Sequence, residues 1–139
     1  MRIPLDYTTK ATLAFNTRTL DQLAALLAPE FHYQDPLGVM TGREATLARE
    51  QTILDAFPDA LVEMEPFAAT QDRLAMTALL KGTFTGPFNM GGHTIQPNGR
   101  PFSFRFAAFF QFDGGYAVQE EVFYDRTELM QVLGLGVGR

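Results

Sequence analysis

The segment from Phe102 to Phe112 constrains the fold most, because phenylalanine alternates there with smaller or polar residues. Asn98-Gly99 lies before the segment and Asp113-Gly114-Gly115 follows it, and both sequences are typical of tight turns. Alternation is the pattern of a strand that buries one of its faces. The sequence therefore predicts a long strand here, which turns back into a second strand from Tyr116 to Tyr124.

Further strands are predicted before this pair. Residues 62–69 and 74–84 are rich in β-forming residues and are joined by a short polar turn at Gln71 and Asp72. Residues 31–35 form a brief strand that ends at Pro36. Residues 86–97 are predicted as a loop that covers an opening, and whether it acts as a lid stays open.

Helices are predicted mainly in the first part of the chain. Three capping pairs, each three residues apart, mark helix starts. These pairs are Thr19 with Gln22, Thr41 with Glu44, and Asp125 with Glu128. Apolar residues follow the first pair up to Leu27 at helical spacing, and a weaker helix covers residues 8–16. The order predicts one α+β domain over residues 1–139, in which a curved antiparallel sheet wraps around N-terminal helices and leaves a pocket.

Composition excludes several classes of function. The 139 residues include 46% hydrophobic and 19% charged residues, which is enough to bury a core. A net charge of −5 without a run of Lys or Arg gives no footprint for nucleic acid or an anionic membrane. The chain contains no cysteine, which excludes disulfides and thiolate metal sites. The sequence also lacks a cofactor-binding motif and a cluster of metal-ligating residues. Without an apolar run long enough for a membrane span or a signal peptide, we expect a cytoplasmic protein that uses no metal and no cofactor.

Two stretches resemble a known superfamily, the nuclear transport factor 2-like proteins. Residues 19–38 are similar to the ketosteroid isomerases, with a helix, a short strand and the motif Asp-Pro-aliphatic-Gly. The part from residue 82 onward resembles the SnoaL-like polyketide cyclases, including a closing Asp-x3-Leu followed by Leu-Gly-Leu. The resemblance covers nearly the whole chain. It implies a cone-shaped fold with an internal pocket and a homodimer formed through the outer face of the sheet.

The resemblance transfers only part of the family chemistry. The general base of the isomerases falls on Asp35, which is present. Their two oxyanion donors fall on Ala11 and Ala108, and the aspartate of the cyclases and of the limonene-type epoxide hydrolases falls on Val122. The residue sets for steroid isomerisation and for epoxide hydrolysis are therefore incomplete.

Strand alternation then selects candidate site residues. If position 108 faces the pocket, several phenylalanines of the same strand face it as well. A pocket lined by phenylalanine explains why the chain contains 13 phenylalanines but only 4 tyrosines and no tryptophan. The predicted catalytic residues are Asp35, Glu120 and Tyr124. The predicted ligand-binding residues are Tyr33, Phe104, Phe106, Phe110 and Val122.

Each candidate has a plain structural alternative. An Asp before Pro commonly opens a turn and binds nearby backbone, whereas a carboxylate in an apolar pocket becomes a better base. A shift of one residue would place Glu121 inward in place of Glu120. Both alternatives stay open at this stage.

Two functions remain possible. The first is proton transfer without a cofactor on a hydrophobic carbonyl or cyclic compound, as in a cyclase or an isomerase. The second is a non-catalytic module that binds a small hydrophobic ligand or oligomerises. The outer sheet face mixes apolar and polar residues as a subunit interface does, and we expect a homodimer through it. This face carries Ser103, Arg105, Ala107, Phe109 and Gln111.

Overall fold

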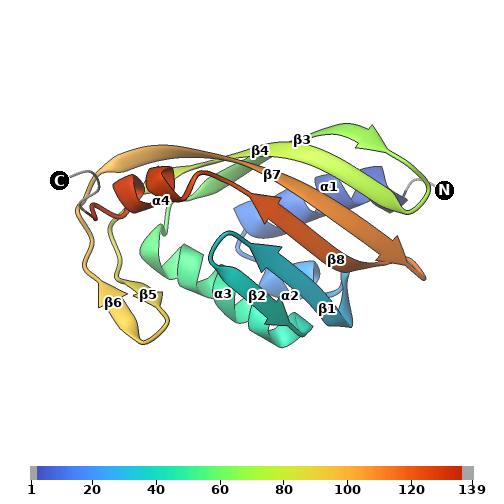
Figure 1. The fold of residues 1–139 in the computed structure, drawn as a ribbon, viewed down its shortest axis with the longest axis horizontal. Coiled ribbons are helices and arrows are strands. Elements are labelled where there is room, and N and C mark those ends of the chain that lie inside the picture. Colours follow the sequence, from blue (N-terminus) through green and yellow to red (C-terminus); the bar gives the residue numbers. More distant parts are fainter. Residues whose placement is uncertain (1–2, 136–139) are drawn as a thin grey trace.

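The computed structural model describes residues 3–135 and consists of a curved sheet, three helices that lie against it or beside it, and a final short helix (Figure 1). The helices are α1 (Ile3–Asn16), α2 (Leu20–Ala24), α3 (Arg43–Ala56) and α4 (Arg126–Val132). The strands are β1 (Leu27–Asp35), β2 (Gly38–Thr41), β3 (Leu61–Ala69), β4 (Arg73–Thr83), β5 (Phe88–Met90), β6 (His93–Ile95), β7 (Pro101–Asp113) and β8 (Tyr116–Phe123).

The main sheet has the order β2-β1-β8-β7-β4-β3, and β5 pairs with β6 in a separate hairpin. The long strands β4 and β7 arch over α1, while α3 lies below them beside β1 and β2 (Figure 1). The α+β class with a curved sheet around helices and a C-terminal helix is thus confirmed. One pairing differs from the expected antiparallel arrangement, because β1 and β8 run parallel.

Strand β1 lies between two other strands of the main sheet. It pairs antiparallel with β2, the next strand in the chain, and parallel with β8, the last strand in the chain. The backbone N–H of Ala117 donates to the carbonyl of Leu26 at the start of this pairing. Leu27, which helical spacing assigned to a helix, is therefore the first residue of β1, and α2 ends at Ala24.

The capping predictions had different outcomes. The Asp125 carboxylate accepts from the backbone N–H of Thr127 at 2.9 Å, as expected for a cap. The prediction at Thr41 is wrong, because Thr41 pairs with His32 as the last residue of β2 and Gly42 caps α3. Gly42 has φ 104°, a backbone conformation that favours glycine and turns the chain sharply from strand to helix.

The predicted loop over residues 86–97 contains the β5–β6 hairpin. Its base is fixed, because the backbone N–H groups of Thr85 and Gly86 donate to the carbonyl of Ala56 at 3.1 and 3.0 Å. A Cβ on Gly86 would clash with the carbonyl of Asp55, so only glycine permits this close approach. The end of α3 thus holds the hairpin beside the space between α3 and the sheet.

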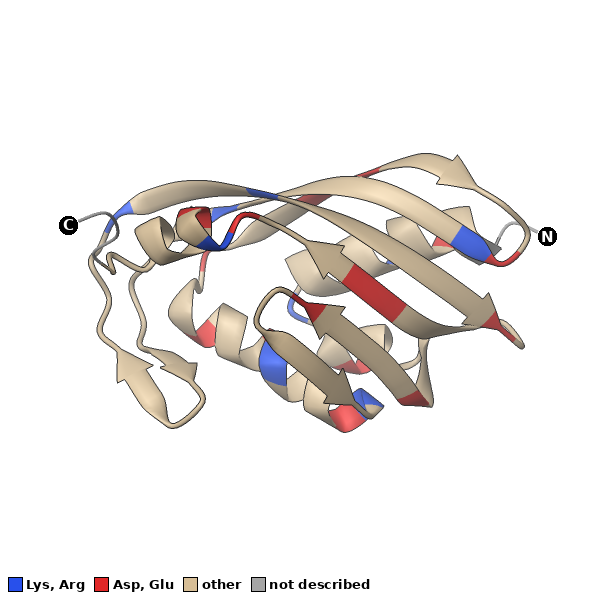
Figure 2. Ribbon diagram, viewed as in Figure 1, with Lys and Arg blue, Asp and Glu red and all other residues tan. Residues whose placement is uncertain are grey.

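Residues of both sheet and helices form the core. On α1, the residues Ala11, Ala14 and Phe15 are all buried. Lys and Arg lie on separate elements and do not gather in one cluster (Figure 2). Between residues 3 and 135, no helix has the length and apolar character that crossing a bilayer requires.

Candidate active site

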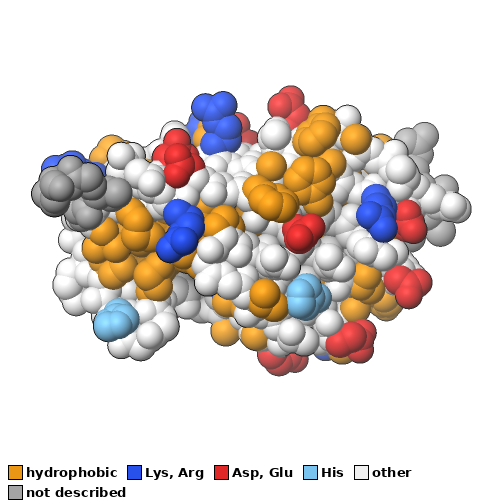
Figure 3. Space-filling view, viewed as in Figure 1, with side chains coloured by type: hydrophobic (Ala, Val, Ile, Leu, Met, Phe, Trp, Pro, Cys, Tyr) orange, Lys and Arg blue, Asp and Glu red, His pale blue; other side chains and the backbone are white. Residues whose placement is uncertain are grey.

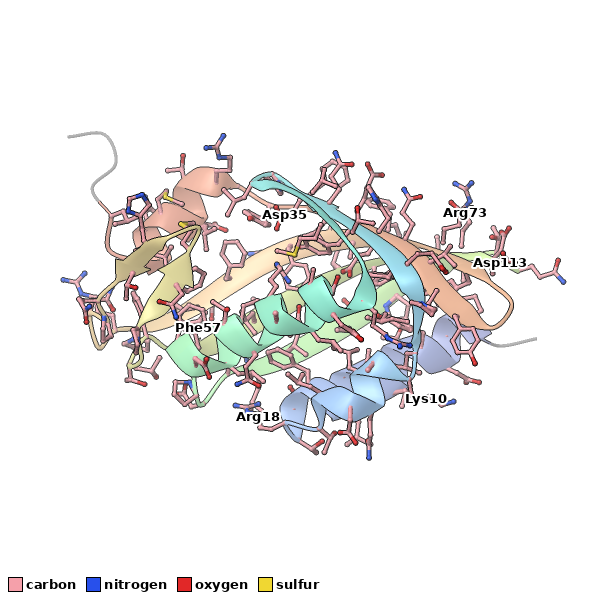
Figure 4. All side chains as sticks on the ribbon, turned by 90° about the horizontal axis from the view of Figure 1, so that it is seen from below. Lys10, Arg18, Asp35, Phe57, Arg73 and Asp113 are labelled. Atoms are coloured by element: carbon pink, nitrogen blue, oxygen red, sulfur yellow. The ribbon has the colours of Figure 1, made fainter. Side chains whose placement is uncertain are left out.

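A cavity of about 490 Å³ lies between the concave face of the sheet and helices α1 and α3. Its volume falls in the range of small-molecule sites. Figure 4 shows Asp35 at the end of β1 above α3, and Phe57 near the end of α3 that faces the hairpin. The rim of the cavity is apolar, and its residues come from the β1–β2 turn and the start of β2, from the β5–β6 hairpin and from α4. The rim residues are Leu37, Val39, Phe88, Met90 and Leu129.

All eight candidate residues line this cavity. They are Tyr33, Asp35, Phe104, Phe106, Phe110, Glu120, Val122 and Tyr124. Glu120 lies opposite Phe110 on β7 and opposite Tyr33 on β1, whereas Glu121 lies opposite Phe109 on the other face. The register therefore places Glu120, and not Glu121, toward the cavity. Ala108, which aligned with an oxyanion donor, is buried and carries no polar group.

The Asp35 carboxylate has a separate set of partners on each oxygen. Oδ1 accepts from the backbone N–H groups of Leu37 at 2.8 Å and Gly38 at 3.2 Å, which is the turn role expected of an Asp before Pro. Oδ2 accepts from the Tyr33 hydroxyl at 2.8 Å and lies 3.7 Å from Arg49 Nη2. Asp35 thus holds the turn and also presents a carboxyl oxygen to the cavity. The surroundings of this carboxylate are not purely apolar, because Arg49 lies beside it.

Arg49 and Glu50 on α3 were not predicted from the sequence. Arg49 Nη1 donates to Glu50 Oε2 at 2.7 Å, and the guanidinium lies over the Tyr33 ring at 4.4 Å from its centre. Burial alone would lower the pKa of Arg49, but the negative charges of Glu50 and its neighbours outweigh burial and raise this pKa. A signal was present, since Thr46, Glu50 and Ile53 recur at helical spacing and a charge in such a stripe points inward.

Glu120 is the most perturbed carboxyl group of the cavity. Burial first, and then the negative charge of Glu50, raise the pKa of Glu120 to about 8, although Arg49 opposes the shift. Burial and neighbouring charges are the causes of this shift, and hydrogen bonding is not among them. At neutral pH, Glu120 is therefore mostly a neutral carboxylic acid, which can donate a proton.

Three tyrosines complete the polar part of the cavity. Burial, followed by the charge of Asp35, raises the pKa of Tyr124 to about 12, and burial also raises the pKa of Tyr33. Tyr7 on α1 was not predicted. It lies one helical turn before Ala11 on the same buried face, and burial followed by the charge of Glu120 raises its pKa. All three side chains are therefore hydrogen-bond donors at neutral pH.

The arrangement places a base and an acid at one cavity. The Asp35 carboxylate is oriented by Tyr33 and Arg49, and the neutral Glu120 lies on the adjacent strand. Two carboxyl groups whose surroundings differ in this way can take and give protons at the same pH. Among the described residues, no group of His, Cys, Asp or Glu has the arrangement of a metal site.

The curved sheet around helices, with an internal cavity lined by aromatic side chains, is the arrangement that the resemblance to the nuclear transport factor 2-like proteins implies. The model of the SnoaL-like polyketide cyclase family matches residues 7–133. The chain belongs to this family.

Solved structures support the same fold. A SnoaL-like polyketide cyclase described as putative, from Jannaschia sp. CCS1, is 18% identical with a TM-score of 0.82, over 97% of this chain and 94% of that one. AclR from Streptomyces galilaeus, described as a putative hydroxylase, is 21% identical with a TM-score of 0.79, over 96% of this chain and 82% of AclR. IdmH from Streptomyces antibioticus, described as a putative polyketide cyclase, is 24% identical with a TM-score of 0.76, over 95% of this chain and 99% of IdmH. Among proteins with curated descriptions, none matches this chain significantly.

Proposed function

We propose that this protein is a cofactor-independent enzyme that transfers a proton on a hydrophobic carbonyl or cyclic compound. One observation carries the proposal: an oriented carboxylate, Asp35, and a neutral carboxylic acid, Glu120, line the same largely apolar cavity. An enzyme that forms an enol needs both groups, because one proton leaves carbon while another reaches oxygen.

The step balances with the residues of the cavity alone. Asp35 takes the proton from the carbon next to the carbonyl, and the electron pair of the C–H bond forms the C=C bond of the enol. The carbonyl oxygen accepts the proton of Glu120, which becomes a carboxylate. In a conjugated dienol, Asp35 returns its proton to a different carbon while the enol O–H proton goes back to Glu120, which gives an isomer. Alternatively, the enol carbon attacks a second carbonyl carbon, whose oxygen takes the proton of Asp35 while the enol O–H proton returns to Glu120, which gives a ring.

Tyr124 and Arg49 support this step. Tyr124 keeps its proton at neutral pH and lies near Asp35, so that it can hold a ligand oxygen by a hydrogen bond. The positive charge of Arg49 compensates the carboxylate that forms when Glu120 loses its proton. Phe104, Phe106, Phe110 and Val122 would surround the apolar body of the ligand.

The test is hydrogen–deuterium exchange at the carbon next to the carbonyl of 1-tetralone, followed by NMR in D2O. Wild-type protein should accelerate exchange, and Asp35→Asn should lose about 10²–10⁴-fold of that rate. Asp113→Asn is the matched control, because Asp113 lies exposed in the β7–β8 turn far from the cavity (Figure 4). Equal rates for wild type and Asp35→Asn would contradict the proposal.

The alternative is a module that binds a small hydrophobic ligand without reaction. The aromatic lining and the apolar rim favour binding of any apolar ring compound. This alternative predicts that 1-tetralone binds, as measured by calorimetry, while exchange stays at the rate of buffer. A bell-shaped dependence of exchange on pH would exclude it.

We also propose a homodimer through the outer face of the sheet. Phe109 and Phe123 are 44% and 53% exposed there, and the centres of their rings lie 5.8 Å apart. Hydrophobic side chains gather over β4, β7 and β8 on this face (Figure 3). Sedimentation velocity at micromolar concentration should give the mass of a dimer, and the mass of a monomer would contradict this proposal.

A further inference from the structure

Glu50 is a mostly buried acid at the cavity that the proposed reaction does not use. It belongs to α3, lines the cavity beside Arg49, and its side chain is 17% exposed. Its Oε2 accepts from Arg49 Nη1 at 2.7 Å. Burial raises the pKa of Glu50, whereas the charge and the hydrogen bond of Arg49 oppose this shift and favour the carboxylate. Glu50 and Arg49 therefore form an ion pair at the wall of the cavity.

Arg49 has a carboxylate on two sides. Its Nη1 donates to Glu50, and its Nη2 lies 3.7 Å from Asp35 Oδ2. The face of the guanidinium lies over the Tyr33 ring, 4.4 Å from the ring centre. One carboxylate already balances the charge of Arg49. The second one adds a negative charge that no other side chain of this cluster balances.

The wall of the cavity offers no second cation. Among the described residues that line it, Arg49 is the only Lys, Arg or His. The acids there are Asp35, Glu50 and Glu120, and Glu120 keeps its proton at neutral pH. The negative charge of Glu50 acts across the cavity, since after burial it is the largest cause of the raised pKa of Glu120. The cavity thus carries one negative charge in excess.

We propose that Glu50 is a specificity-determining residue, which keeps Arg49 paired and thereby excludes ligands with a carboxylate group from the cavity. This inference deepens the proposed function, on which it rests for the ketone class of ligand. A guanidinium without Glu50 would be a ready partner for a ligand carboxylate, because its planar N–H groups match two carboxylate oxygens. With Glu50 in place, an anionic ligand meets the excess negative charge. The favoured substrate is then an uncharged ketone.

The apolar lining also disfavours an anionic ligand, because burial removes the water around its charge. A preference of wild type for an uncharged ligand therefore does not by itself identify Glu50 as the cause. Glu50→Gln separates the two causes, since it leaves the apolar lining in place and removes only the negative charge. The variant should fold, because glutamine keeps an oxygen that can accept from Arg49 Nη1.

The test is calorimetric binding at pH 7 of two ligands with nearly equal shape, 1-tetralone-6-carboxylate and 1-tetralone-6-carboxamide. Wild type should bind the carboxamide at least about tenfold more tightly than the carboxylate. In Glu50→Gln, affinity for the carboxylate should rise about tenfold, while affinity for the carboxamide should change less than about twofold. Glu44→Gln is the matched control, because Glu44 is exposed on the same helix and should leave both affinities unchanged.

A second variant identifies the partner of the ligand carboxylate. Adding Arg49→Gln to Glu50→Gln should remove the gain in carboxylate affinity, because the cation is then absent. Persistence of the gain would overturn the role given to Arg49 and with it the inference.

Three further results would overturn the inference. They are equal affinity of wild type for the two ligands, an equal change for both ligands in Glu50→Gln, and failure of wild type to bind the carboxamide at millimolar concentration. The result is separate from the proposed reaction, because it measures binding alone. If Asp35→Asn exchanged as fast as wild type, the proposed reaction would fail while the selectivity set by Glu50 would remain.

Discussion

Glu120 and Glu121 are neighbours of the same chemical type, but the pleat of β8 places them on opposite faces of the sheet. Glu120 faces a cavity with Glu50 and Asp35, where burial raises its pKa to about 8. Glu121 lies opposite Phe109 on the outer face. The comparison shows that strand register alone decides whether a glutamate is a neutral acid in a cavity or part of a surface.

The largest expected difference between the two faces is in the dependence of stability on pH. The folded-state pKa of Glu120 lies above its ordinary value near 4.5, so the folded protein holds a proton that the unfolded chain loses between pH 4.5 and 8. Stability should therefore fall as pH rises through this window. The loss is on the order of 4 kcal/mol in the free energy of unfolding.

Urea denaturation at several pH values measures this effect. The free energy of unfolding of Glu120→Gln should equal that of wild type near pH 4.5 and exceed it near pH 9. For Glu121→Gln, the free energy of unfolding should equal that of wild type at every pH. If Glu120→Gln and wild type keep parallel curves, the carboxyl group of Glu120 is not held neutral by the cavity.

A second contrast compares one arginine on each side of the sheet. Arg49→Met leaves Asp35 and Glu50 beside the cavity without their cation, and we expect a loss of about 3 kcal/mol in the free energy of unfolding. Arg105→Met removes an exposed arginine from the outer face and, at a protein concentration low enough to keep the chain monomeric, should change stability by no more than about 0.5 kcal/mol. Denaturation at pH 7 compares the two, and similar losses would mean that the Arg49 ion pairs do not stabilise the fold.

The smallest expected effect is on the rate of hydrogen–deuterium exchange at the carbon next to the carbonyl of 1-tetralone. Glu120→Gln keeps a hydrogen-bond donor but cannot give up a proton, so exchange into 1-tetralone should slow about 10²-fold. Glu121→Gln should exchange at the wild-type rate. A fast Glu120→Gln variant would assign the acid to another group, and Tyr124 would be the next residue to replace.

The sequence contained most of the sheet face that builds the cavity. Alternation in residues 102–112 and 116–124 follows directly from the pleat, and it predicted which side chains face inward, including Glu120. Asp35 was found because its motif resembles that of a family. These residues were accessible because each depends on local geometry or on a short motif.

The helix residues of the cavity were harder to predict. Arg49 stands among several charged residues of α3, and only its pairing with Asp35 on β1 shows that it faces inward. Tyr7 lies one turn from the position that the family uses, so comparison with the motif pointed to Ala11. Thr41 failed as a cap because pairing with His32 in β2 competes with the helix start. In each case a contact between distant parts of the chain decides the outcome.

The parallel pairing of β1 with β8 has a consequence for the order in which the site forms. Asp35 and Arg49 belong to the first half of the chain, whereas Glu120 belongs to its last strand, which the β1–β8 pairing places beside β1. Contacts between segments so far apart in sequence close large loops and form slowly. During refolding, the proposed proton-transfer activity should therefore be the last property to return, after the β3–β4 and β7–β8 hairpins have formed.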